Sequence, residues 1–485
     1  MSKRTFLRCG LAAALMAALG SCATAPLPVS EGTVIRDVAV VDTRTGALQP
    51  HRNVVLQGGR ILAVTDGPVA LSGTAAEVDG SGKYLVPGFN DMHTHALPRV
   101  QQQPGVWALL VANGITGIRE MAGAPELIAA AHKMNAERAA GRLDAPEILQ
   151  IPGPLFLGAP SAAAAKQAVR AHKAMGADFI KVVDGSNEAV RAVLEEARAQ
   201  GLHVSGHLEP MFDTTEAARA GWRSIEHLGS GMGERLDCSA DAAGVRSALA
   251  RGEGAHPAFT PAYILNPMLF RAEDAPLYRR ILATQDAAKC SALAAEFARD
   301  ETWQVPTLIR VHGMVFSDAA VHRQDPHLAS MDAATRAQWE DVGRRYAQMP
   351  PAAAATFREY YAKQAALLPL FREAGVKMMT GSDLGGAWVV PGFALHDEFR
   401  LLAAAGLTPL QVLQMTTWNP AEYLGRQATM GSVEPGRQAD LVLLDANPLA
   451  DVANLDRIAA VVLRGKVLQR PELQRMLEDA AHEAR

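Results

Sequence analysis

The sequence is poor in cysteine, in aromatic residues and in clusters of positive charge. Its 485 residues include 4 cysteines, 5% aromatic residues and 20% charged residues, and the formal net charge is −4. Because there is no dense run of lysine and arginine, the sequence lacks the basic surface that nucleic-acid binding requires, and no nucleic-acid partner is expected. Hydrophobic residues make up 49% of the chain, which is typical of a folded protein.

Long apolar runs are also lacking, except for a short one near the start. Residues 1–22 combine a basic stretch, MSKRTFLR, with an apolar stretch, CGLAAALMAALG, that is too short to span a bilayer. This pattern predicts a signal peptide. Its end, LGSC, resembles the bacterial lipobox, which implies a lipid anchor on Cys22 on the periplasmic side of the membrane. Ala23 after this cysteine favours the outer membrane, and a plain signal peptide cut near the ATA of residues 23–25 is the alternative.

Two cysteines remain in the exported chain beyond this segment. Cys238 and Cys290 can pair in an oxidising compartment, but they lack the CxxC spacing of a metal site. Their spacing leaves open whether they form a disulfide.

The two ends of the exported chain have similar patterns. Residues 23–32 are expected to form a tether, and residues 33–86 hold short β runs separated by glycine turns. Residues 431–470 have the same character, so we predict one small composite β-sandwich built from both segments. Residues 471–485 are expected to form a C-terminal helical tail.

The central segment, residues 87–430, alternates apolar strand-like runs with helical runs that close near glycine. The strand-like runs number eight, from YLVPGFNDMHTH to VKMMTGSD. Repeated βα units with apolar strands predict a parallel sheet, and eight of them predict an α/β fold with a (β/α)8 barrel.

Side chains able to bind metal lie at the ends of several of these strands. A His-x-His pair in PGFNDMHTH is by itself compatible with two ordinary polar residues. In barrels of this type, however, functional groups gather at the carboxyl ends of the strands, where further ligands follow. The candidate ligands are His93, His95, Lys181, His207, His227 and Asp383.

Lys181 lies inside the apolar run DFIKVV, where a bare ammonium group would be costly to bury. Carboxylation by CO2 would convert it to a carbamate anion that can bridge two cations. Alternatively, Lys181 points to a water-filled mouth or pairs with an acid such as Asp184.

The ordered set of motifs resembles the amidohydrolase superfamily. PGFNDMHTH, FIK, GH, an EH twenty residues further on and GSD follow one another, and the ending LTPLQVLQMTTWNPAEYLG is similar to the family's. The short interval between His207 and His227 resembles the branch of imidazolonepropionase-like and Xaa-Pro or Xaa-Arg dipeptidase-like enzymes. Lys181 favours the binuclear, dipeptidase-like members. VSGHLEP departs from the AHAHG-like strand of those relatives, and this weakens the inference about specificity.

The resemblance implies a set of roles. His93, His95 and Asp383 would hold one divalent metal, His207 and His227 a second, and carboxylated Lys181 would bridge them with a hydroxide. Zinc is the first choice, with manganese, cobalt or iron as alternatives. Asp383 would act as general base and then acid.

The implied activity is hydrolysis of a C–N bond in a small molecule, similar to that of a dipeptidase or carboxypeptidase. The alternatives are a lactonase or phosphotriesterase, a mononuclear cyclic-amide hydrolase, and a metal-binding lipoprotein without catalysis. Candidate substrate contacts are Tyr263, Arg310 and Glu209.

Overall fold

The computed structural model describes residues 25–100, 103, 105–229, 231–254 and 270–485. Cys22 and Tyr263 lie outside the described residues. No helix within the described part is both long and apolar enough to cross a membrane.

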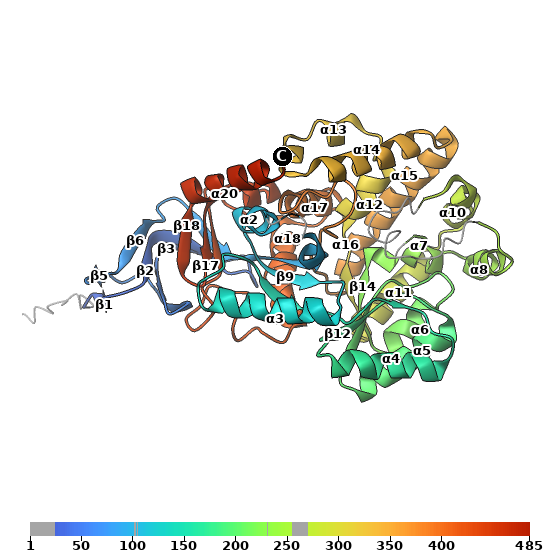
Figure 1. Ribbon diagram of the computed structural model, residues 1–485, viewed down its shortest axis with the longest axis horizontal. Helices are drawn as coiled ribbons and strands as arrows, with labels where there is room; N and C mark the ends of the chain where they lie inside the picture. Colours follow the sequence, from blue (N-terminus) through green and yellow to red (C-terminus); the bar gives the residue numbers. More distant parts are fainter. Residues whose placement is uncertain (1–24, 101–102, 104, 230, 255–269) are drawn as a thin grey trace, which may run out of the picture.

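Strands from both ends of the chain form one mixed sheet, seen at one end of the molecule in Figure 1. The two parts meet where β16 pairs antiparallel with β7, with Leu441 opposite Pro87 and Leu444 opposite Tyr84. Its strands in spatial order are β18 (Lys466–Gln469), β17 (Ile458–Leu463), β16 (Leu441–Leu444), β7 (Tyr84–Pro87), β2 (Thr33–Val41), β3 (Leu48–Gln57) and β4 (Arg60–Thr65), with β6 (Ala76–Asp79) beside β2.

Part of the segment expected to be a tether is a strand instead. Leu27–Val29 forms β1, which pairs parallel with β5 (Val69–Leu71). Val29 is buried against Val34 and Val55, so apolar burial holds this segment on the domain. The predicted tail is helix α20 (Arg470–Glu483), which packs against β17 and α2.

The central segment contains two parallel sheets. The first consists of β8 (Phe89–Thr94), β9 (Ile115–Glu120) and β10 (Glu147–Gln150), and the second of β11 (Phe156–Leu157), β12 (Phe179–Asp184), β13 (His203–Gly206), β14 (Trp222–Glu226) and β15 (Trp303–Val305).

Parallel bridges connect these sheets on both sides. Pro152 pairs with Phe179 on one side. On the other side, the segment that contains Met378 and Leu384 bridges to Gln304 of β15 and to Thr94 of β8. This segment, expected to be the last strand of a barrel, therefore makes ladder contacts with both neighbours but is too irregular to form a continuous strand.

Helices surround the parallel sheets, and two long groups of them follow β14 and β15 (Figure 1). A disulfide between Cys238 and Cys290 ties the end of α7 to α11 within the first group. The helices before β14 are α1 (Ala96–Val100), α2 (Val106–Ala112), α3 (Pro125–Ala139), α4 (Ala162–Ala174), α5 (Asn187–Ala199) and α6 (Thr214–Arg219). The described helices between β14 and β15 are α7 (Gly233–Asp237), α8 (Ala242–Ala250), α10 (Ala275–Ala283) and α11 (Ala287–Arg299). Those after β15 are α12 (Leu308–Val315), α13 (Ala320–Arg323), α14 (Ala333–Ala347), α15 (Pro351–Ala365), α16 (Leu367–Glu373), α17 (Phe393–Ala404), α18 (Pro409–Thr416) and α19 (Trp418–Tyr423).

Candidate metal centre

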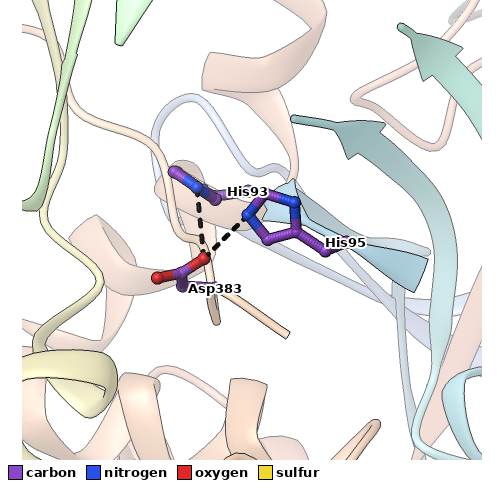
Figure 2. A group of neighbouring side chains, drawn as sticks. All are labelled: His93, His95 and Asp383. Atoms are coloured by element: carbon purple, nitrogen blue, oxygen red, sulfur yellow. Dashed lines mark ion pairs between the residues drawn. The ribbon is translucent and has the colours of Figure 1, made fainter. Parts of the chain in front are cut away.

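The end of β8 and the segment after Met378 bring three predicted ligands together (Figure 2). The Oδ1 atom of Asp383 lies 3.3 Å from His93 Nε2 and 3.1 Å from His95 Nε2. All three residues are buried, and their ligand atoms lie within 4.8 Å of one another. They form a compact group of two imidazoles and one carboxylate.

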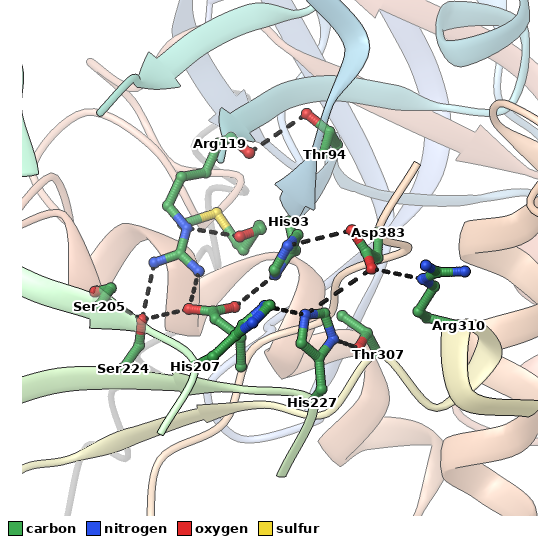
Figure 3. Close-up of polar contacts among 12 residues, drawn as sticks. His93, Thr94, Arg119, Ser205, His207, Ser224, His227, Thr307, Arg310 and Asp383 are labelled. Carbon is green, nitrogen blue, oxygen red and sulfur yellow. Dashed lines mark hydrogen bonds and ion pairs between the residues drawn. The ribbon is translucent and has the colours of Figure 1, made fainter. Parts of the chain in front are cut away.

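A second pair of histidines faces this group (Figure 3). His207 follows β13 and His227 follows β14, and their Nε2 atoms are 3.1 Å apart. His227 Nε2 lies 3.9 Å from Asp383 Oδ2, so Asp383 stands between the two sets of imidazoles. The hydroxyl of Thr307 pairs with His227 Nδ1 on the far side of the ring.

Lys181 lies within β12 and is 1% exposed, and its Nζ has no hydrogen-bond partner among the described residues. Burial lowers the pKa of Lys181 to about 8. The alternative ion pair with Asp184 is not formed. An amine with a lowered pKa is neutral more often at pH 7, which is the state that reacts with CO2.

The backbone around the ligands is strained. Three non-glycine residues of the site have left-handed φ angles: Asp383 (53°), His227 (60°) and Thr307 (43°). Two glycines before ligands allow close approach: a Cβ on Gly206 would lie 2.0 Å from the Val182 carbonyl oxygen, and one on Gly381 would lie 2.7 Å from His93 Cβ. The GH and GSD motifs thus need glycine for steric reasons.

The donor set fits divalent metal ions. Two ligands of one tetrahedral zinc ion lie about 3.3 Å apart, close to the spacings within both groups. Burial lowers the pKa of His95 and holds the pKa values of His207 and His227 well below the ordinary value, which favours the neutral imidazoles that bind metal. His93 Nε2 and Lys181 Nζ are buried without hydrogen-bond partners among the described residues.

Two of the three candidate substrate contacts, Arg310 and Glu209, lie among the described residues. Arg310 on α12 is 4% exposed, and its Nε donates to Asp383 Oδ2 at 3.0 Å, so it meets a ligand of the centre. Glu209, two residues after His207, is half-buried, and burial together with the charge of Asp184 raises its pKa to about 8.

Two charged residues at the centre, Arg119 and Glu226, were not predicted from the sequence. Glu226 contacts His93 Nδ1 at 2.7 Å, and Arg119 contacts Glu226 at 2.8 Å. Arg119 and its neighbour Glu120 lie in the strand-like run GIREM, and Glu226 lies in the run SIEH. A charge in such a run must find a partner when the strand is buried. That signal was present in the sequence.

The start of α12, which carries Arg310, is held by another buried carboxyl. Ile309 N–H donates to Glu398 Oε2 on α17 at 2.7 Å. Glu398 is 0% exposed, and burial raises its pKa to about 8.

We expect the Glu398 carboxyl to make stability depend on pH. The folded protein keeps this proton up to about pH 8, whereas the unfolded chain releases it near the ordinary value of 4.5, so the free energy of unfolding falls as pH rises between these values. We expect Glu398→Gln to reduce the difference between the free energies of unfolding at pH 5 and pH 8 by about 2–4 kcal/mol. Urea unfolding of the metal-free protein at pH 5 and at pH 8 measures these free energies. Glu359→Gln, on the exposed face of α15, is the control, and equal pH dependence in wild type and Glu398→Gln would contradict the prediction.

A comparison with known protein families finds a match that includes one predicted ligand of this site. Residues 304–468 match the sequence profile of the amidohydrolase family. This stretch contains Asp383 but none of the five other predicted ligands, which all precede it in the sequence. An adenine deaminase of Ligilactobacillus salivarius is 33% identical over 82 residues, which span 16% of this chain and 14% of that relative. The match therefore covers only a small part of the curated relative.

Solved structures match over a larger share of the chain. Bottromycin amidohydrolase matches with a TM-score of 0.69 at 21% identity, covering 93% of this chain and 90% of that one. A prolidase complexed with N-methylphosphonate-L-proline matches with a TM-score of 0.61 at 23% identity, covering 90% and 99%. The chain has the fold of these proteins and, over residues 304–468, the sequence pattern of the amidohydrolase family.

Proposed function

We propose that the protein is a metal-dependent hydrolase that cleaves amide or peptide-like C–N bonds in small molecules. The observation that carries this proposal is the convergence of His93, His95 and Asp383 beside the His207–His227 pair. The family match and the folds shared with an amidohydrolase and a prolidase support it.

The parallel segments support a closed (β/α)8 barrel as the scaffold. Bridges at Pro152–Phe179, Gln304–Met378 and Thr94–Leu384 connect the two parallel sheets into a ring. The ligands lie at the carboxyl ends of its strands, the edge at which barrels of this type carry their functional groups.

In this proposal His93, His95 and Asp383 would hold one divalent metal, and His207 and His227 would hold a second. Lys181, as a carbamate, would be a further ligand, and zinc would suit the imidazole and carboxylate donors. When bound, such metals acidify water and polarise the substrate carbonyl.

Two side chains of the protein take part in proton transfer: Asp383 carries the proton, and Arg310 orients the carboxylate of Asp383. Asp383 accepts the proton of the attacking water and delivers it to the leaving nitrogen, so that the C–N bond breaks into a carboxylic acid and an amine. The Arg310 guanidinium, 3.0 Å from Asp383 Oδ2, orients this carboxylate. Glu209 and Arg310 remain candidate contacts for polar groups of the substrate, and Tyr263 is a further candidate from the sequence.

A substrate panel tests the activity. A soluble form that lacks residues 1–22, loaded with zinc, should release amines from dipeptides, including Xaa-Pro and Xaa-Arg, with the highest kcat/KM of the panel. Lactones, a phosphotriester and adenine form the other arms. Turnover of lactone or phosphotriester alone would assign a different bond, and release of ammonia from adenine would assign a deaminase, the activity named for the Ligilactobacillus salivarius relative.

For the location we propose export to the periplasmic side, with a lipid anchor on Cys22 in the outer membrane. The disulfide between Cys238 and Cys290 supports an oxidising compartment.

A further inference from the structure

Glu226 is the last residue of β14 and directly precedes His227. Successive side chains of a strand point to opposite faces, yet both residues contact groups of the same centre: Glu226 contacts His93, and His227 faces His207. His227 has a left-handed φ of 60°, which lies outside the extended range in which this alternation holds. The carboxyl group of Glu226 thus lies directly behind His93, a predicted metal ligand.

The carboxyl group of Glu226 is held as an anion by three donors. Arg119 Nη2 donates to Oε1 at 2.8 Å and Ser224 Oγ donates to the same oxygen at 2.7 Å, while Oε2 lies 2.7 Å from His93 Nδ1. Glu226 and Arg119 are both 0% exposed, so each charge depends on the other to be tolerated in the interior.

Arg119 is itself fixed in place (Figure 3). Its Nε donates to the Met92 carbonyl at 2.6 Å, and its Nη1 donates to Ser224 Oγ at 3.0 Å and Tyr423 Oη at 3.1 Å. The guanidinium group has only hydrogen-bond donors. The atom of residue 226 that faces Arg119 must therefore be a hydrogen-bond acceptor.

These contacts determine the tautomer of His93. A carboxylate only accepts hydrogen bonds, so the 2.7 Å contact requires that His93 Nδ1 carries the proton and donates it. The lone pair of the neutral ring is then on Nε2, the atom that lies 3.3 Å from Asp383 Oδ1.

We propose that Glu226, paired with Arg119, is a positioning residue that sets the Nδ1–H tautomer of His93 and thereby aims Nε2 into the centre. This inference rests on the proposed metal centre. A carboxylate behind a ligating histidine orients the ring and strengthens it as a ligand, and its loss typically costs 10–100-fold in metal affinity.

Glu226→Gln tests the proposal because it changes the number of acceptors without changing the size of the side chain. A glutamine side chain has only one acceptor oxygen, and Arg119 and Ser224 both donate to that position. The NH2 group of the glutamine therefore faces His93 Nδ1 and donates a hydrogen bond to it. The proton of His93 is thereby moved to Nε2, the atom that must bind metal. We expect the tautomer to invert and the affinity of the weakened site for zinc to fall 10–100-fold.

Two measurements are needed, and neither depends on turnover. Nitrogen-15 spectra of histidine-labelled, metal-free protein report the tautomer, with His93 assigned from a His93→Gln variant. Titration against a chelating indicator reports zinc affinity. Ser205→Ala is the matched control, since Ser205 hydrogen-bonds to Ser224 and Tyr423 in the same network; it should leave the tautomer and the affinity unchanged.

An Nε2–H tautomer in the wild-type protein overturns the proposal, even if Glu226→Gln fails to fold. A folded Glu226→Gln protein with wild-type affinity overturns it as well. A protein that shows the expected tautomer and affinity change but hydrolyses no amide would leave this inference standing while the proposed function fails.

Discussion

Replacing Asp383 by asparagine should abolish measurable turnover, with kcat falling by about 10²–10⁴-fold or more. The asparagine amide retains an oxygen that can face His93 and His95, but it cannot take up a proton from water. Metal content should therefore decline little compared with activity. Elemental analysis of the purified variant, alongside steady-state rates on the best substrate of the panel, measures both quantities.

The control for Asp383→Asn is Asp341→Asn, which alters a half-buried carboxylate on α14 that pairs with Arg345. It should retain wild-type kcat. Undiminished turnover in Asp383→Asn would contradict the assigned proton transfer, and loss of all metal from it would show that Asp383 acts mainly as a ligand.

Replacing Lys181 by alanine should reduce the metal content from about two ions per chain to about one or fewer. The physical reason is that Lys181, as a carbamate, is the proposed group that touches both ions, so its removal leaves His207 and His227 as a two-ligand site. Two protein ligands seldom hold zinc, which takes three or four. Protein produced with zinc and bicarbonate, and analysed for metal per chain, gives the number directly.

Lys173→Ala, on the exposed face of α4, is the matched control and should retain wild-type metal content. Labelling with 13C-bicarbonate should add a carbamate signal to the wild type that Lys181→Ala lacks. A wild-type protein with a single metal, unchanged in Lys181→Ala, would indicate a mononuclear centre on His93, His95 and Asp383.

The convergence of the candidate ligands was predictable because it depends on strand ends rather than on particular contacts. Parallel strands present their carboxyl ends to one edge, so the residues that end HVSGH and SIEH had to lie near the one that ends MHTH. In the structure the Nε2 atoms of His207 and His227 lie 3.1 Å apart, as their positions at strand ends predict. Similar reasoning on β-rich runs led to a joint domain from both chain ends, which pair through β7 and β16.

Contacts between side chains on different elements were not predictable. The sequence offers Arg310 as a candidate substrate contact, but it did not predict that the Nε of Arg310 donates to Asp383 Oδ2, 73 residues later. The sequence shows that a buried arginine needs an acceptor, but many carboxylates are available, and the packing of α12 selects one of them.

The sequence by itself determined which kinds of side chain the proposed metal centre would use and the edge at which they gather, because both follow from the apolar strand pattern and the order of the motifs. Only the tertiary structure decided the partners: Glu226 with His93 and Arg119, and Cys238 with Cys290. Those pairings depend on backbone turns such as the left-handed φ at His227 and on packing between distant segments. Hydrogen bonds act over about 3 Å, so a small rotation of the backbone changes which groups can meet.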